Sequence, residues 1–484
     1  MRFNKCLLVR PSYGQSRHAI ATIPVGLGYI AEALAREGID YELFDMAFED
    51  QGLKKYDVQH LKEKVKELKP DVIGFSLMTL SYKQHYALIE EIKKDFPEVI
   101  IVVGGPHVST LREKVLDECF SIDFGFVLEA DESFPALCRG EKVHDIKGIL
   151  YRDGERVVYT GDREFIKDLN GLPFPRYAKF ELDKYSNQTM YLSTSRGCPN
   201  ECTYCPVKLA VGRRFRYVNA DTLINEISYW YSKGYRQFGF WDDNFTLLKQ
   251  RVFSLCDMIE QKKFQGCSFS LPNGIRADKV DRELLKRMRS VGFRQLSIGV
   301  ESASDKVLKI LKKGETIEQI EEAIKDSTEL GFDVYLYFIL GSPGETMEDV
   351  EKSFNLALKY PIVDAIFHKM TPYPGTELFE WVTKRNLFLR LPEEYLNDAN
   401  YYSAEPFFVT DELPYEDRVL IFKRSLDVSK IIRIRRKKRQ MVRLGLVGKI
   451  LAHFSQTNLF INLYRNSIVL RNFASRIRPW IISR

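Results

Sequence analysis

Three cysteines stand close together in the segment TSRGCPNECTYCPV, which spans residues 194–207. Three residues separate Cys198 from Cys202, and two separate Cys202 from Cys205. Four thiolates close a structural metal site, whereas three leave one position open. Each iron of a [4Fe–4S] cube takes one external ligand, so three cysteines would leave one iron free for a substrate or cofactor. A zinc ion with a distant fourth ligand is the alternative.

The cysteine loop opens a series of alternating strand and helix patterns. Six apolar, strand-like segments separated by helical patterns predict a partial (β/α)6 barrel over residues 186–385. The active site of such a barrel lies at the carboxyl ends of its strands. The polar motifs fall there, because the cysteine loop follows the first strand, DDNF the second, ES the fourth and GSPGET the fifth.

The remaining chain divides into three further parts. Residues 1–140 alternate short apolar runs with helical patterns, which predicts an α/β domain with a doubly wound parallel sheet. Residues 141–185 contain the hairpin signal GILYRDGERVVYT and the proline-rich linker NGLPFPRY. Residues 386–484 are predicted to be a helical region with a basic tail.

The cysteine spacing resembles that of the radical S-adenosylmethionine (SAM) enzymes. Their signature, Cys-x3-Cys-x-aromatic-Cys, is matched by Cys198, Cys202, Tyr204 and Cys205. The resemblance implies that the open iron is chelated by the amino and carboxylate groups of SAM. One electron, from a donor such as flavodoxin or ferredoxin, then cleaves SAM to methionine and a 5′-deoxyadenosyl radical. The cofactor supplies this chemistry, while the protein positions it and excludes water.

Two carboxylate motifs of the barrel occupy positions that contact SAM in this family. The resemblance implies that Asp242 or Asp243 accepts hydrogen bonds from the amino group of SAM. A pair of helix N-cap residues is the alternative. Glu301 resembles the family residue near the ribose, where a carboxylate accepts hydroxyl hydrogens. A helix-capping role is the alternative for Glu301.

Two further motifs complete the expected SAM site. GSPGET, which includes Gly341 and Pro343, lets the backbone approach a flat ring, and the family packs adenine there. A plain turn is the alternative. Arg276 in NGIRAD is a candidate for the SAM carboxylate, and an exposed salt bridge is its alternative.

The N-terminal residues resemble the cobalamin-binding domain that precedes the barrel in the B12-dependent branch of this family. The match covers IPVGLGYIAEAL, GFSLMT, VVGGPHVS and LEADES. The resemblance implies cobalamin contacts from six residues: Ser76, Thr79, Gly104, Gly105, His107 and Glu129. Leu128 replaces a glycine that the family usually has before this glutamate. His18 lacks the Asp-x-His-x-x-Gly pattern, so we expect no histidine ligand to cobalt from its loop. A sheet that has lost its ligand, or binds another nucleotide, is the alternative.

Charge is distributed unevenly along the chain. The formal net charge is +6, but residues 428–484 hold fourteen Lys or Arg and no Asp or Glu, so the first 427 residues carry −8. Apolar residues continue through this tail, which predicts peripheral membrane contact by residues 428–484 and suits a lipid-like substrate. Packing of a helical face on the barrel is one alternative. Nucleic-acid binding is another, and it is less favoured.

The N-terminal segment MRFNKCLLVR has no long apolar run behind its charges, which predicts the absence of a signal peptide. The strongest apolar runs are shorter than the roughly 20 residues that a spanning helix needs. The sequence therefore predicts a cytoplasmic chain, with contact at the inner face of the membrane through its tail.

Together these features predict a B12-dependent radical SAM enzyme that C-methylates an unactivated carbon of a small-molecule or lipid-like substrate. Its cofactors would be a [4Fe–4S] cluster, SAM and cobalamin. One alternative is a non-methylating, ring-forming enzyme of the same branch. Another is a tRNA methylthiotransferase, although the dispersed remaining cysteines do not resemble the second triplet that such enzymes carry. A zinc-stabilised binding protein is the non-enzymatic alternative.

Overall fold

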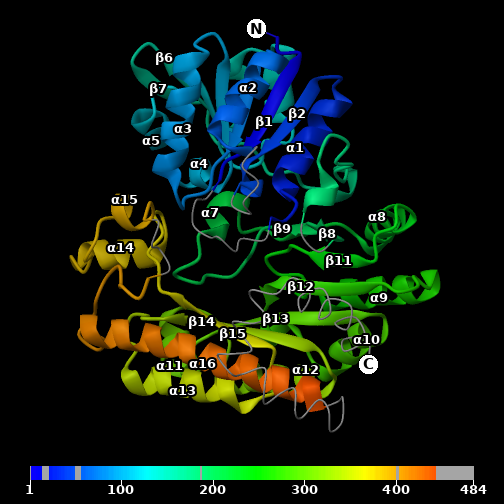
Figure 1. The fold of residues 1–484 in the computed structure, drawn as a ribbon, viewed down its shortest axis with the longest axis vertical. Coiled ribbons are helices and arrows are strands. Elements are labelled where there is room, and N and C mark those ends of the chain that lie inside the picture. The colour runs from blue at the N-terminus through cyan, green and yellow to red at the C-terminus, as the bar shows by residue number, and fades with distance from the viewer. Residues whose placement is uncertain (1, 13–20, 50–55, 186–187, 399–402, 443–484) are drawn as a thin grey trace, which may run out of the picture.

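The computed structural model describes residues 2–12, 21–49, 56–185, 188–398 and 403–442. Two α/β domains are stacked one above the other, with the N-terminal domain uppermost in Figure 1 and the barrel below it. The short elements β8, β9 and α7 lie where the two domains meet.

The N-terminal domain is built on a sheet with strand order β2-β1-β3-β4-β5-β6-β7. Its first five strands are parallel: β1 (Lys5–Arg10), β2 (Asp40–Asp45), β3 (Val72–Ser76), β4 (Ile100–Gly104) and β5 (Phe124–Phe126). The helices are α1 (Val25–Arg36), α2 (Val58–Leu68), α3 (Tyr82–Asp95), α4 (Pro106–Leu111), α5 (Glu113–Glu118) and α6 (Ser133–Arg139). The order 2-1-3-4-5 confirms the predicted doubly wound sheet, whose ligands bind beyond the carboxyl ends of its strands.

The predicted hairpin forms from β6 (Ile149–Asp153) and β7 (Arg156–Tyr159), with Gly154 at φ 61° in the turn. Strand β6 pairs antiparallel with β5, so the hairpin extends the N-terminal sheet. The sequence assigns the hairpin to a separate segment, 141–185. The structure joins it to the first domain because β6 pairs with β5, and Ile149 and Leu150 are buried there.

The second domain is an open sheet of six parallel strands in the order β15-β14-β13-β12-β11-β8. The strands are β8 (Thr189–Leu192), β11 (Gln237–Phe240), β12 (Ser268–Ile275), β13 (Phe293–Glu301), β14 (Asp333–Leu340) and β15 (Asp364–Lys369). Helices α8 (Ala220–Ser232), α9 (Lys249–Lys262), α10 (Arg282–Ser290), α11 (Asp305–Ile310), α12 (Ile317–Glu329) and α13 (Met347–Lys359) connect them. This is the predicted partial (β/α)6 barrel.

Short elements complete the chain. A two-stranded antiparallel ladder joins β9 (Ser195–Arg196) to β10 (Arg216–Tyr217), and α7 (Val207–Val211) lies between them in sequence. Single 3-10 turns occur at Met46–Phe48, Val143–Asp145, Leu169–Gly171, Leu182–Lys184 and Ala277–Lys279.

The barrel core lies between the sheet and its covering helices. The alternating residues Val334, Leu336, Phe338 and Leu340 of β14 are buried, while the residues between them are half-buried on the inner face. The Phe240 ring stacks on phenylalanines of the neighbouring strands β12 and β13, with centroids 5.8–6.1 Å apart, and on Phe245 of the following loop at 4.6 Å. This apolar layer leaves the inner face and the strand ends to polar residues.

The C-terminal region contains α14 (Glu377–Lys384), α15 (Pro392–Tyr395) and the long helix α16 (Tyr415–Val442). Helix α16 packs on β15 and α13, along the lower edge of the barrel in Figure 1. The Ser429 hydroxyl donates to the Ala365 carbonyl (2.6 Å), and Arg433 pairs with Asp364 (3.1 Å). The described start of the basic tail therefore packs on the barrel, as one alternative expected; residues 443–484 lie outside the described residues. Within the described ranges, no helix is both long and apolar enough to cross a membrane.

Candidate functional site

The cysteine loop follows β8 and β9 and is closed at its base by the β9–β10 ladder. The Cys198 amide donates to the Gly212 carbonyl (3.1 Å), and the Cys205 amide donates to the Cys202 carbonyl (3.3 Å). Gly197 has φ 89°, and a Cβ atom there would overlap the carbonyl oxygen of Arg214. The close crossing of the two loop arms therefore requires glycine.

The three thiols share one environment near the barrel mouth. Cys202 is buried, and Cys198 and Cys205 are half-buried. Burial raises the pKa of Cys205 to about 12, and the neighbouring Cys202 and Cys198 add to the increase. The side-chain amide of Asn200 donates to the sulfur of Cys198 (3.3 Å). The three thiols are therefore close enough to influence one another's ionisation.

A buried charge network lies behind Cys202. The Lys313 ammonium is 2.9 Å from Oε1 of Glu301 and 3.3 Å from Oε2 of Glu315. Burial lowers the pKa of Lys313, but the two carboxylates outweigh it and the net pKa is raised. Burial and then Glu301 raise the pKa of Tyr204 well above its usual value, so its phenol stays protonated.

Glu301 sits at a bulge between β13 and β14, with φ 61°. The bulge and the left-handed backbone turn its carboxylate toward Lys313. Helix α11 begins after Ser304, so Glu301 is a partner of Lys313 and not a helix cap. Its predicted place at the carboxyl end of the fourth barrel strand is where the structure puts it.

Asp242 and Asp243 have different surroundings although they are adjacent. Asp242 is buried and accepts hydrogen bonds from the amide and the hydroxyl of Thr194, both at 2.5 Å. Asp243 is half-buried; burial first, and Asp242 second, raise its pKa to about 6. The next helix, α9, begins after Leu248, so neither aspartate caps it. Asp243 is therefore the residue whose carboxylate is open to a ligand.

Arg276 is buried, with 8% of its surface exposed, so the expected alternative of an exposed salt bridge is not observed. Its guanidinium pairs with Asp278 (2.9 Å) and donates to the Lys313 carbonyl (2.7 Å). Arg276 thus stabilises the backbone at Lys313. A SAM carboxylate could bind Arg276 only alongside Asp278 and the Lys313 carbonyl.

The GSPGET turn is held from both sides. Gly341 has φ 87°, and Glu345 accepts the amides of Gly341 and Ser342 at 2.6 and 3.0 Å. Arg418 of α16 donates to the Gly341 carbonyl (2.8 Å). Pro343 is buried in the turn. The turn is rigid because the fold satisfies its backbone groups, and its capacity for adenine remains a prediction.

Strand ends of the N-terminal domain bring several predicted cobalamin contacts to one edge. Ser76 and Gly104 pair in register at the ends of β3 and β4, and Thr79 lies half-buried in the following connection. Gly105 has φ 104°, and a Cβ atom there would lie 2.7 Å from the carbonyl oxygen of Leu77. Gly105 is therefore needed because any side chain there would collide with the backbone of Leu77.

His107 and Glu129 are engaged by protein groups. His107 is fully buried, its Nε2 lies 2.8 Å from the Tyr86 hydroxyl, and burial lowers its pKa to about 3. Glu129 pairs with Arg196 and Arg216. Leu128 adopts φ 66°, the conformation that explains the usual glycine at this position. The loop of His18 lies outside the described residues.

Sequence reasoning missed Lys313, Glu315 and Thr194, which hold the predicted residues in place. Lysine and glutamate are common surface residues, and nothing in their spacing predicts burial beside a cysteine loop. Glu315 accepts the amide of Ala277 (2.5 Å), which ties the turn after β12 to the same network.

Two models of known protein families match the chain. The B12 binding domain matches residues 20–138, and the Radical SAM superfamily matches residues 192–357. An uncharacterised methyltransferase of Pyrococcus horikoshii is 32% identical over 417 residues, which cover 84% of this chain and 88% of that protein. The chain belongs to the B12-binding radical SAM family.

A second sequence relative and a solved structure are also similar to this radical SAM enzyme. A cytidylyl-2-hydroxyethylphosphonate methyltransferase of Streptomyces wedmorensis is 26% identical, with 83% of this chain and 85% of that protein covered. The cobalamin-dependent SAM radical enzyme OxsB, solved with aqua-cobalamin and SAM bound, has a TM-score of 0.72 at 17% identity, covering 98% of this chain and 75% of that one. The structural likeness shows the same fold.

The cofactors of the radical SAM enzyme are a [4Fe–4S] cluster, SAM and cobalamin. Within the described ranges, no three His, Cys, Asp or Glu side chains converge closely enough to hold a single ion. Each thiolate of a cube binds a different iron, so three cysteines supply the protein ligands of a cube with one open iron.

Proposed function

We propose that this radical SAM enzyme methylates an unactivated carbon of a small molecule held between its two domains. The observation that carries the proposal is the joining of two sites. The end of the B12-binding sheet and the mouth of the barrel meet at the cysteine loop, where Arg196 contacts Asp131 and the Tyr29 hydroxyl donates to the Ser193 carbonyl. A methyl donor and a radical source would then act on one bound molecule.

The chain's own residues supply binding and orientation. Cys198, Cys202 and Cys205 would hold the cluster, and Asp243 would accept hydrogen bonds from the SAM ammonium. Glu301 would accept from the ribose while Lys313 fixes its carboxylate. When bound, the cluster and SAM supply a radical that removes hydrogen, and cobalamin supplies the methyl group.

The predicted backbone contacts complete the assignment. The turn that includes Gly341 and Pro343 would pack against adenine. Its shape is fixed because the amides of Gly341 and Ser342 are bonded to Glu345. Ser76, Thr79, Gly104 and Gly105 would line the cobalamin site at the ends of β3 and β4. An electron donor such as flavodoxin or ferredoxin is part of the proposal.

The inner face of the barrel offers polar groups to a substrate. His368 on β15 meets the Tyr337 ring edge-on, with centroids 6.3 Å apart. Desolvation of the ring lowers the pKa of His368, so the imidazole is neutral near pH 7. The Asn273 side chain donates to the Asp242 carbonyl (3.2 Å) beside Asp243. These groups suit hydrogen bonds to an uncharged polar substituent.

The deciding experiment uses SAM with an isotope-labelled methyl group and an extract from a strain that lacks the gene. Anaerobic enzyme with a reductant should transfer the label to a new product, detected by mass spectrometry. The Cys202→Ala variant is the control and should yield no labelled product. Release of 5′-deoxyadenosine together with an unlabelled product would replace methylation by ring formation. Without any 5′-deoxyadenosine, the proposal fails.

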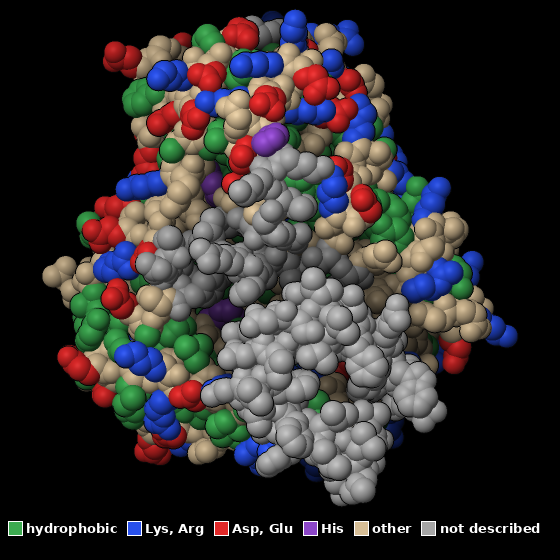
Figure 2. Space-filling view, in the orientation of Figure 1, with side chains coloured by type: hydrophobic (Ala, Val, Ile, Leu, Met, Phe, Trp, Pro, Cys, Tyr) green, Lys and Arg blue, Asp and Glu red, His purple; other side chains and the backbone are tan. Residues whose placement is uncertain are grey.

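We also propose that residues 428–484 contact a membrane surface and that the substrate is lipid-like. Lys430, Lys437 and Lys438 are exposed on α16, whereas Arg433 pairs with Asp364 and Arg439 donates to the Ile362 carbonyl. Each exposed cation near anionic lipid contributes about 1 kcal/mol. On the face shown in Figure 2, basic and acidic side chains are interspersed over the N-terminal domain, which does not favour a nucleic-acid surface there.

Flotation with anionic and neutral vesicles tests the membrane contact. The full chain should float with anionic vesicles, and a variant with Lys430, Lys437 and Lys438 changed to Gln should float less. If the triple variant floats as well as the full chain, the three lysines do not contribute to membrane contact. If the chain without residues 443–484 also floats equally well, the tail does not contribute either.

A further inference from the structure

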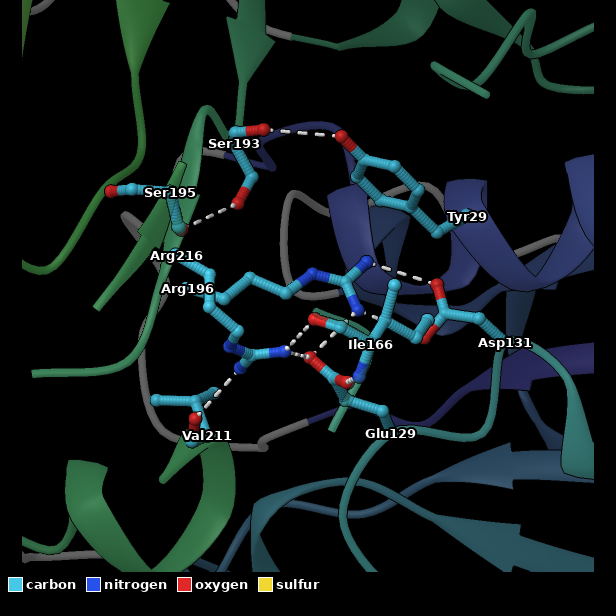
Figure 3. A network of polar contacts seen from close by, with 9 residues as sticks. All are labelled: Tyr29, Glu129, Asp131, Ile166, Ser193, Ser195, Arg196, Val211 and Arg216. Atoms are coloured by element: carbon cyan, nitrogen blue, oxygen red, sulfur yellow. Dashed lines mark hydrogen bonds and ion pairs between the residues drawn. The ribbon is translucent and has the colours of Figure 1, made fainter. Parts of the chain in front are cut away.

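Four charged side chains join the two domains beside the cysteine loop (Figure 3). Glu129 and Asp131 come from the loop after β5, whereas Arg196 and Arg216 belong to β9 and β10. Only 6% of each carboxylate side chain and 2% of the Arg216 side chain are exposed. Charges so deeply buried require partners of opposite sign, and each has them here.

The pairs have directional geometry. Arg196 donates to both oxygens of Asp131, at 2.9 Å each, and to Oε1 of Glu129 at 3.1 Å. Arg216 donates to the same Glu129 oxygen at 2.7 Å. The guanidinium of Arg196 also lies over the ring of Tyr29, 4.9 Å from its centroid. A bidentate pair fixes the orientation of a side chain as well as its position.

Both arginines stand at the base of the cysteine loop. Arg196 is two residues before Cys198, and Arg216 closes the other arm through the β9–β10 ladder. Arg216 also donates to the carbonyls of Val211 (3.1 Å) and Ile166 (2.9 Å). The B12-binding domain therefore holds the two ends of the segment that carries the cysteines.

We infer that Glu129 and Asp131 are positioning residues for the cluster loop, supplied by the other domain. Through Arg196 and Arg216 they set the place and orientation of the loop, so cluster loading depends on the domain contact. The inference rests on the proposed role of the three cysteines as cluster ligands. It differs from simple adhesion between domains, which would leave the properties of the cluster unchanged.

The test compares the full-length variants Asp131→Asn and Glu129→Gln with Asp131→Glu, which keeps the charge. Glu226→Gln is the matched control, because Glu226 is equally buried and accepts from Arg176 (2.8 Å) away from the cysteine loop. Each protein is reconstituted anaerobically with iron and sulfide. Iron per chain, the electron paramagnetic resonance spectrum of the reduced cluster with and without SAM, and cobalamin retention are then measured.

Asp131→Asn and Glu129→Gln should bind the cluster about tenfold more weakly, the usual effect of losing groups that orient metal ligands. The SAM-dependent change in the spectrum should shrink with it. Asp131→Glu should restore both properties in part, and Glu226→Gln should match the unaltered protein. Unaltered iron content and spectra in the Asn and Gln variants would overturn the inference.

If Asp131→Asn or Glu129→Gln fails to fold, as judged by near-ultraviolet circular dichroism, Arg216→Lys takes its place. It keeps the charge but loses the forked bonds to Glu129, Ile166 and Val211. Reduced iron content in that variant supports the inference, and unaltered content refutes it. Failure of the proposed ligand set itself would appear separately, as a cluster that survives in the Cys202→Ala variant.

Discussion

The Nζ atom of Lys313 lies 2.9 Å from Oε1 of Glu301, and Gly299 lies beside both groups. A Cβ atom on Gly299 would stand 2.9 Å from that oxygen and 3.1 Å from the ammonium. The strand thus lacks a side chain where the ion pair needs room. The pair fixes the one carboxylate at the end of β13 that is expected to meet the ribose.

The Gly299→Ala variant should therefore displace the Glu301–Lys313 pair. We expect SAM to bind about tenfold more weakly, a loss of about 1.4 kcal/mol. Equilibrium dialysis of anaerobic protein with labelled SAM measures the effect. Gly171→Ala is the control, since no atom lies within 4 Å of the added methyl group. An unchanged dissociation constant for Gly299→Ala would show that this carboxylate does not contribute to the site.

Asp243 should make SAM binding depend on pH. Its pKa is raised to about 6, first by burial and then by Asp242. An ammonium group binds the ionised carboxylate, so below pH 6 a proton must leave before SAM binds. Affinity should be constant above pH 6 and should fall about tenfold per pH unit below it. Calorimetric titration across this range should show the slope in the unaltered protein and a flat profile in Asp243→Asn; the same slope in both would assign it to another group.

Each of the substitutions Cys198→Ala, Cys202→Ala and Cys205→Ala should remove the cluster. A cube held at three corners loses a third of its protein ligands in each variant. Iron and sulfide analysis after anaerobic reconstitution should give values near background. Cys256→Ala, on the buried face of α9, should retain the cluster. A colourless protein that binds zinc through the three loop cysteines would contradict this assignment.

Arg418 should matter more to stability than its neighbours on α16. It donates to the carbonyls of Gly341 and Leu413, both at 2.8 Å, and to the Thr410 hydroxyl at 3.2 Å. Arg418→Met keeps the bulk but leaves these buried acceptors unpaired, at a cost of about 2–4 kcal/mol in the free energy of unfolding. Arg424→Ala, which breaks a half-exposed pair with Glu351, should cost less than about 1 kcal/mol. Urea denaturation of both variants measures the difference, and equal losses would refute the role given to the GSPGET turn.

The architecture and the cysteine loop could be predicted because both depend on local sequence patterns. Strand and helix periodicities gave the two parallel sheets, and parallel strands bring their carboxyl ends to one edge. Cys198, Glu301 and Gly341 could therefore be placed at one mouth from sequence alone. The spacing of the cysteines needed no tertiary information.

The roles of individual side chains were less accessible. Asp242 and Asp243 are chemically alike, and only the fold shows that Thr194 occupies the first. Arg418 reaches Gly341 from 77 residues away, and Glu129 reaches Arg216 from 87. Long-range pairs of this kind leave no periodic signal. The hairpin β6–β7 is predictable from its turn, but its backbone pairing with β5 is a tertiary contact that the local pattern does not specify.

Helix α16 has a consequence for the shape of the barrel. Among the residues that the structure describes, the open sheet ends at β15, which pairs with β14 alone, and α16 packs on it. Unprotected strand edges recruit further strands from other molecules. A chain that stopped before Tyr415 would expose that edge, and we expect it to self-associate into aggregates before it lost its secondary structure. We therefore expect the C-terminal helix to protect this edge from pairing with other copies of the chain.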